Sequence, residues 1–88
     1  MIINPNYEIV EIADEYLAVP VGDATISMHG VVELSEATAF LLQEMKTPRS
    51  KDELIDILTQ VYDVEKSVAA KDVERIISTL LNIGVIIE

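Results

Sequence analysis

The sequence contains no cysteine, and its 88 positions hold only three glycines, three prolines and four aromatic residues. The lack of cysteine excludes disulfide bonds, thiol catalysis and cysteine-ligated metals. It also fits a reducing compartment, so we expect a cytoplasmic protein. No apolar run approaches the roughly 18 residues of a membrane-spanning helix. Because the three glycines are isolated, a glycine-rich phosphate loop is excluded as well.

Basic residues are also scarce: there are six, against sixteen acidic residues, for a formal net charge of −10. The first 45 residues contain eight acids and no Lys or Arg, and all six basic residues lie between Lys46 and Arg75. Such a chain repels phosphate backbones and anionic lipids, so we expect neither nucleic acid nor a membrane as its partner. Contacts with an acidic partner would have to come from the C-terminal half.

The chain is rich in aliphatic residues. Half of its residues are hydrophobic, and Ile, Val and Leu together account for 30 of the 88. This is enough to fill a core and excludes a disordered chain. Since there is no linker, repeat, low-complexity stretch or signal peptide, we interpret residues 1–88 as a single small domain.

The N-terminal third predicts a small antiparallel sheet of about three strands, at residues 7–13, 16–19 and 25–34. The first strand carries a slip in its alternation that indicates a β-bulge, and residues 14–15 are expected to turn. Pro20 ends the second strand, and the third is clearest over residues 31–34. A ribbon of this size cannot bury its own face, so helices must cover one side.

Three helices are expected after the strands, and their starts are marked by the capping residues Ser35, Ser50 and Asp63. Ser50 and Glu53 form a capping box at the second start. The third helix should run over residues 65–83 and end at Gly84, followed by an extended tail. Strands followed by helices predict an α+β fold.

The third predicted helix is too apolar for one core face. Its stripe at helical spacing consists of Ala69, Val73, Ile76, Leu80 and Ile83. Either this helix is central in the fold, or part of the stripe lines a groove, and the sequence leaves both open. Lys71, Arg75 and Thr79 are spaced four apart and form a polar ridge beside the stripe. The ridge is either a solvated face or the flank of that groove.

The residues offer no site for chemistry. His29 is the only histidine, and its place beside Gly30 is typical of a turn residue rather than a metal ligand. A Ser-His-Asp arrangement would need three convergent groups in a domain with little volume to desolvate them. We therefore expect no catalytic residue, no metal site, no cofactor and no enzymatic activity.

The order and spacing of several segments resemble the PqqD family over almost the whole chain. Residues 30–36, GVVELSE, are similar to its Gly-x-x-x-Leu-Asn-Glu run, and residues 51–55, KDELI, to the start of its second helix. The Tyr-Asp-Val of residues 62–64, with Asp-Val at 72–73, and LLNIGVI at 80–86 are similar to its later motifs. Ser35 stands where the family commonly has Asn, but both residues cap helices.

The resemblance implies a winged helix-turn-helix-like fold and a peptide-binding function. Members of the family are also called RiPP recognition elements. They capture the leader segment of a ribosomally synthesised precursor peptide and deliver it to a modifying enzyme, often of the radical SAM class. The resemblance thus implies a non-catalytic peptide chaperone in cofactor or natural-product biosynthesis, with a precursor peptide and a modifying enzyme as its partners.

The same resemblance implies where the leader would bind. It would add as a strand to the edge formed by residues 31–34 and lie against residues 72–79 of the third helix. A bare edge supplies backbone hydrogen bonds, apolar pockets supply selectivity, and the basic ridge would meet acidic leader residues. The predicted peptide-binding residues are Val31, Val32, Glu33, Leu34, Lys71, Asp72, Val73, Arg75, Ile76 and Thr79.

Two alternatives and one addition remain at this point. A winged-helix DNA-binding regulator would need a basic recognition helix, and the three cations of the third helix face three nearby acids: Glu65, Asp72 and Glu74. A protein-docking subunit could use the same groove, and the sequence does not separate it from a leader-binding protein. An exposed edge strand also permits a homodimer through that edge.

Overall fold

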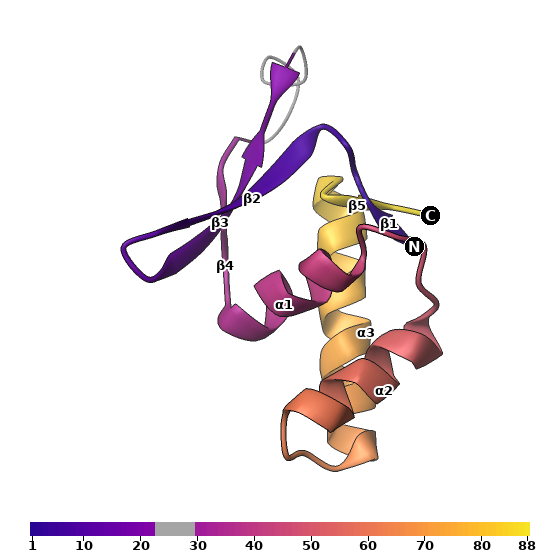
Figure 1. Cartoon of the computed structure of the whole chain (residues 1–88). Coiled ribbons are helices and arrows are strands. Elements are labelled where there is room, and N and C mark those ends of the chain that lie inside the picture. The colour runs from indigo at the N-terminus through magenta and orange to yellow at the C-terminus, as the bar shows by residue number, and fades with distance from the viewer. Residues whose placement is uncertain (23–29) are drawn as a thin grey trace.

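The computed structural model describes residues 1–22 and 30–88, and the expected strands precede the helices. In chain order its elements are β1 (Ile2–Ile3), β2 (Tyr7–Ile12), β3 (Glu15–Pro20), β4 (Val32–Leu34), α1 (Glu36–Glu44), α2 (Lys51–Val61), α3 (Lys66–Ile83) and β5 (Ile86–Ile87). Figure 1 shows α1 between the sheet of β2, β3 and β4 and the other two helices. The predicted α+β class is confirmed.

The main sheet is antiparallel, in the order β2-β3-β4. Pairing of β2 with β3 is continuous from Tyr7 opposite Pro20 to Ile12 opposite Glu15, so the expected bulge is wrong. The slip in the hydrophobic pattern has another cause. Neighbouring strand residues point to opposite faces, and both faces carry aliphatic side chains here. Ile9 packs against the core, whereas Val10 lies on the face turned away from it.

The turn between β2 and β3 lies one residue earlier than expected. Ala13 and Asp14 have φ values of 50° and 67°, the left-handed geometry of a two-residue type I′ turn. The third predicted strand is described only in its C-terminal part, as β4. Residues 23–29, which include His29 and half of that expected strand, lie outside the described residues.

A second, two-stranded sheet joins the two ends of the chain. Ile2 pairs with Ile87 and Ile3 with Ile86, which places the termini side by side (Figure 1). The side-chain Nδ2 of Asn4 also donates to the Gly84 carbonyl at 2.9 Å. The C-terminal tail was expected to be extended, but β1 was not predicted, because two residues are too few to display an alternating pattern.

The helix ends follow the predicted signals in most places. The Ser35 Oγ accepts a hydrogen bond from the Thr38 amide at 3.1 Å. The capping box of Ser50 and Glu53 is present in both directions. Gly84 ends α3 in the left-handed conformation, with φ of 83°. The expected Asp63 cap is wrong: α3 begins after Glu65, where no side chain caps the helix.

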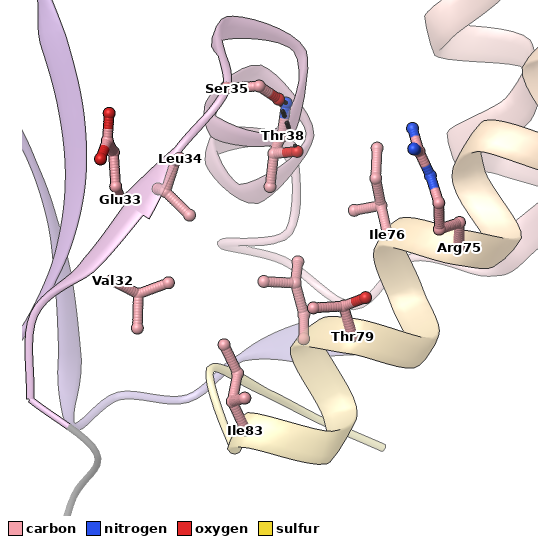
Figure 2. Close-up of a pocket in the computed structure, with 10 residues that line it drawn as sticks. Val32, Glu33, Leu34, Ser35, Thr38, Arg75, Ile76, Thr79 and Ile83 are labelled. Atoms are coloured by element: carbon pink, nitrogen blue, oxygen red, sulfur yellow. Dashed lines mark hydrogen bonds between the residues drawn. The ribbon is translucent and has the colours of Figure 1, made fainter.

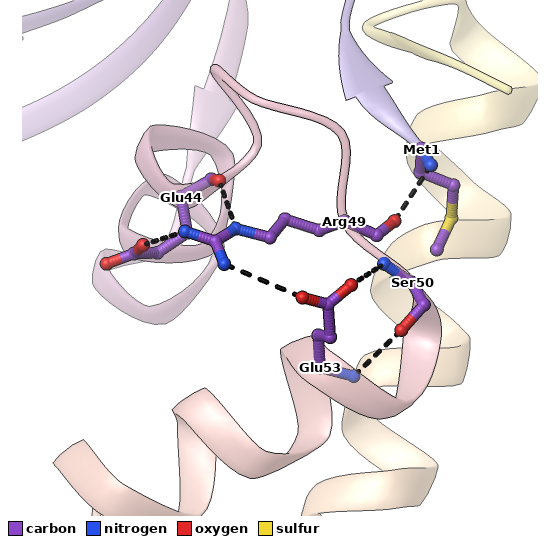
Figure 3. Close-up of polar contacts among 5 residues, drawn as sticks. All are labelled: Met1, Glu44, Arg49, Ser50 and Glu53. Atoms are coloured by element: carbon purple, nitrogen blue, oxygen red, sulfur yellow. Dashed lines mark hydrogen bonds and ion pairs between the residues drawn. The ribbon is translucent and has the colours of Figure 1, made fainter.

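Arg49 fastens α1, α2 and the N-terminus together (Figure 3). Its Nε donates to the Glu44 carbonyl at 3.1 Å, and its guanidinium pairs with the carboxylates of Glu44 at 3.5 Å and Glu53 at 3.7 Å. The Met1 amino group donates to the Arg49 carbonyl at 2.8 Å. Hydrogen bonding to Ser50 and the nearby Arg49 charge hold the pKa of Glu53 below its ordinary value. These contacts join the end of α1, the start of α2 and the N-terminus.

The core contains only hydrophobic side chains among the described residues. Helix α3 contributes Ala69, Val73 and Leu80, and α1 and α2 meet it with leucines and Met45. The sheet adds Tyr7, Ala18 and Leu34, whose side chains all point to its inner face. The pairing of β2 with β3 places Tyr7 and Ala18 on this face, and Leu34 of β4 shares it because it lies opposite Tyr16 of β3. In the described part of the chain, no helix has the length and hydrophobicity to cross a membrane.

Candidate functional site

The outer edge of β4 is available for another strand. Among the described residues, β4 is paired with β3 alone. The two-residue turn makes Ile12 and Glu15 a hydrogen-bonded pair, and main-chain groups alternate in direction along the strands from there. In β3, this alternation turns the main-chain groups of Tyr16 and Ala18 toward β4. Their partners Leu34 and Val32 therefore point their own main-chain groups toward β3. The N–H and C=O of Glu33 therefore point outward.

A groove of about 340 Å³ lies between this edge and α3, and we call it the β4–α3 groove. Figure 2 shows Val32 and Leu34 on the side of β4 that faces α3, while Glu33 points the other way. The residues that line the groove are Val32, Glu33, Leu34, Ser35, Thr38, Arg75, Ile76, Thr79, Leu80 and Ile83.

The groove has an apolar floor. Leu34 and Leu80 are buried, and Val32, Ile76 and Ile83 are half-buried. Because a half-buried aliphatic side chain still exposes surface to water, covering it with an apolar ligand is favourable, at roughly 25 cal/mol per Å². Spacing along α3 places Ile76, Leu80 and Ile83 on successive turns of one face. The floor therefore runs the length of the groove.

Two polar residues of the groove, Ser35 and Thr38, lie at the start of α1. The Ser35 hydroxyl donates to Thr38 Oγ1 at 2.8 Å while accepting from the Thr38 amide. Arg75 is the only cationic residue among those that line the groove in the described chain. Its side chain is 75% exposed, and its guanidinium lies 3.5 Å from the Asp72 carboxylate on the preceding turn. A weak, exposed ion pair of this kind exchanges easily for a carboxylate of a ligand.

Two other cations of the C-terminal half, Lys51 and Lys66, form ion pairs between α2 and α3. Lys51 binds Glu74, and this contact holds the pKa of the Glu74 carboxyl below its ordinary value and ties α2 to α3. Lys66 lies 3.9 Å from Asp56, also between α3 and α2. Two of the three cations on α3 are thus paired with acids, and nothing in the geometry favours the DNA-binding alternative.

The structure brings six of the ten predicted site residues to the groove: Val32, Glu33, Leu34, Arg75, Ile76 and Thr79. Val73 is 0% exposed, so it supports the wall of the groove from within the core instead of meeting a ligand. Val31 is 59% exposed and immediately precedes β4, in line with its edge. Lys71 is exposed but does not line the groove, and Asp72 reaches it only through Arg75.

Four lining residues were not predicted: Ser35, Thr38, Leu80 and Ile83. Ser35 was assigned to helix capping, which it also performs, and Thr38 received no role. Leu80 and Ile83 were recognised as part of the apolar stripe of α3. The stripe was interpreted either as a core face or as the lining of a groove, and each interpretation holds for some of its residues. Ala69 and Val73 lie in the core, whereas Ile76 and Ile83 line the groove.

Comparisons with known proteins agree with this architecture. The chain is similar to the solved structure "TbiB1 in Complex with the TbiA(beta) Leader Peptide", with a TM-score of 0.74 and 16% identity, over 97% of this chain and 93% of that one. It is also similar to "Lasso peptide synthetase B1 complexed with the leader peptide", with a TM-score of 0.70 and 18% identity, over 91% and 88% of the two chains. At these identities the likeness establishes the fold.

The sequence comparison is more specific. No curated protein sequence matches the chain. The family described as Coenzyme PQQ synthesis protein D (PqqD) matches residues 15–86, a span that runs from the start of β3 to β5 and includes every residue of the β4–α3 groove. The chain therefore belongs to the PqqD family.

Proposed function

We propose that this protein binds the leader segment of a ribosomally synthesised precursor peptide, which adds as a strand to the edge of β4. The observation that carries the proposal is the combination of an unpaired edge with an apolar groove directly beside it. Strand addition uses both features: main-chain hydrogen bonds give affinity, and pockets for alternate side chains give selectivity. Both similar structures named above are complexes with leader peptides.

The geometry of β4 restricts which leader sequences fit. An added strand places every second side chain on the groove side, about 6.6–6.8 Å apart. Two apolar leader residues at positions i and i+2 would cover Val32, Leu34 and Ile76. An acidic leader residue beyond them would reach Arg75, which could exchange its pair with Asp72 for the ligand. We expect a dissociation constant of roughly 0.1–1 μM for such a short extended interface.

The protein then acts as a carrier without chemistry of its own. Among the residues that the structure describes, its groove is lined by aliphatic residues, three hydroxyls, one arginine and one outward-pointing glutamate, which supply no paired acid and base. We infer that the bound leader is presented, in the cytoplasm, to a separate modifying enzyme of the radical SAM class or a similar one. A homodimer through β4 would use the same edge, so leader should convert any such dimer to monomer in size-exclusion chromatography.

The decisive experiment is a pair of N-methylated leaders. The probe is a leader segment found by searching the neighbouring genes for a short precursor peptide, and it is titrated by calorimetry against the protein. Successive amides of a bound strand point alternately to β4 and to solvent. N-methylation of the alternate residues that face β4 should therefore abolish binding, while methylation of the other set should leave it nearly unchanged. Strand addition would be contradicted if both sets of methylated leaders lost the same affinity, or if neither set lost any.

A further inference from the structure

A second groove, of about 370 Å³, lies on the other side of α1. Its walls include Tyr16 of β3, Phe40 and Gln43 of α1, and Val61 and Tyr62 at the end of α2. We call it the aromatic groove. Helix α1 separates the two grooves, because Thr38 lines the β4–α3 groove whereas Phe40 and Gln43 line this one.

The aromatic residues of the chain are concentrated here. The whole sequence has four, and three of them, Tyr16, Phe40 and Tyr62, line this groove. The rings of Phe40 and Tyr62 meet edge to face, with centroids 6.2 Å apart and planes at 75°. All three rings are half-buried, so each is held by packing while part of its surface remains open. Three partly open rings from three elements form a preorganised aromatic wall.

The charge around this wall is negative. Glu36 lines the groove, and Glu11 lies directly opposite Tyr16 in the β2–β3 register. The Glu11 carboxylate raises the pKa of the Tyr16 phenol above its ordinary value, and desolvation and the Glu36 charge act in the same direction. No Lys or Arg lines the groove within the described residues. The ring faces and the carboxylates thus attract the same kind of ligand, which is a cation.

We propose that the aromatic groove binds an arginine side chain from a basic segment of a partner protein. A guanidinium stacks on aromatic faces and forms bidentate pairs with carboxylates, and a desolvated cation–π contact adds to the attraction. Glu36 is placed at the groove to accept such a pair. A second copy of this chain is a poor occupant, because each copy carries a net charge of −10 and two copies therefore repel each other.

This site is separate from the proposed leader site and does not depend on it. The two grooves share α1, but no described residue lines both of them. An extended leader in the β4–α3 groove would leave the aromatic groove free. A partner held there by its arginine would be separated from the bound leader only by one helix, which is about 10 Å wide. The arrangement suits a protein that holds two molecules next to each other.

The test uses acetylated hexa-arginine amide as the probe, with hexa-glutamate as the negative control. We expect saturable shifts of the Tyr16, Phe40 and Tyr62 ring resonances in NMR spectra, with no shift of the Val32–Leu34 amides of β4. Phe40→Leu should weaken probe binding about fivefold through loss of a cation–π face. Glu36→Gln, which leaves the rings in place, should weaken it about threefold.

Asp52→Asn is the matched control for Glu36→Gln. Both acids are exposed and lie in the first turn of a helix, but Asp52 is at the far end of α2 from Val61, about 13.5 Å along the axis. It should change probe affinity by less than about 1.5-fold. Equal losses for the two variants, or unchanged binding by Phe40→Leu, would overturn the proposal in favour of diffuse attraction. A dimer of the free chain that Phe40→Leu dissociates would overturn it in favour of self-association.

Discussion

The two grooves on either side of α1 differ in chemistry although they share that helix. The β4–α3 groove is aliphatic, with a strand edge and a single arginine. The aromatic groove has three rings and a carboxylate, and within residues 1–22 and 30–88 no free strand edge borders it. A backbone edge binds many sequences in the same way, whereas an aromatic and acidic wall selects one kind of side chain. The difference indicates one surface for an extended peptide and another for a single anchoring residue.

The largest effect should come from removing the outward main-chain donor of β4. Glu33→Pro deletes the N–H that faces the free edge and leaves the β3–β4 hydrogen bonds of Val32 and Leu34 in place. We expect leader affinity, measured by calorimetry, to fall by more than about thirtyfold, since a hydrogen bond is lost and the proline ring obstructs the added strand. Binding of hexa-arginine to the aromatic groove should be unchanged.

Glu33→Ala is the matched control, because it removes the same side chain and keeps the N–H. Leader affinity should change by less than about twofold in this variant. An equal loss in the alanine and proline variants would show that the side chain, not the edge, binds the leader. Circular dichroism of both variants checks that the sheet is retained.

The next largest effect should come from the floor of the β4–α3 groove. Ile76→Ala removes apolar surface that is half-buried in the free protein and would be covered in the complex. The change removes three carbons, together about 2.4 kcal/mol at roughly 0.8 kcal/mol for each buried methylene. Because most of the side chain is already buried in the free protein, binding gains about a third of this, roughly 0.8 kcal/mol, and leader affinity should fall about fourfold. Val61→Ala is the control, since Val61 is 56% exposed and lines only the aromatic groove. A loss of leader affinity in the control would contradict the separation of the two sites.

The parts of the structure behind these two predictions could be predicted from the sequence to different degrees. The capping residues Ser35 and Ser50 located two helix starts, and Gly84 located the end of α3, because each acts on its own helix terminus. The β4 edge and the α3 wall came from the family resemblance. Which members of the α3 stripe are open could not be predicted, because it depends on how far β4 stands from the helix.

The aromatic groove was beyond prediction from the sequence for a related reason. Tyr16 lies in β3, Phe40 lies in α1 and Tyr62 follows the last residue of α2, and no spacing along the chain links them. They meet only because α1 packs between the sheet and α2, with Arg49 holding the two helices in place. The turn at Ala13 and Asp14 was predicted one residue too late for a local reason. It lacks the glycine that usually marks a type I′ turn in a sequence.

A smaller effect is expected at the single cation of the β4–α3 groove. Arg75→Glu should weaken binding of a leader with an acidic residue about threefold, because an exposed pair contributes little and the reversed charge adds repulsion. The loss should shrink at high salt as the charges are screened. Lys71→Glu, one turn away on α3 and outside the groove, is the control. Identical losses in both variants would show a general charge effect and remove Arg75 from the site.

The smallest effect tests the negative field of the aromatic groove. Because the Glu11 charge is the main cause of the raised Tyr16 pKa, Glu11→Gln should lower that pKa toward its ordinary value. Glu36→Gln should lower it less, since the Glu36 charge ranks below that of Glu11. The Tyr16 Cζ resonance, followed by NMR from pH 8 to 12, distinguishes this phenol from Tyr7 and Tyr62. Glu8→Gln is the control, because Glu8 lies opposite Val19, on the face of the sheet that Tyr16 does not share. If Glu8→Gln moved the pKa as far as Glu11→Gln, the shift would reflect the net charge of the protein. The two grooves would then differ in shape and hydrophobicity, but not in local field.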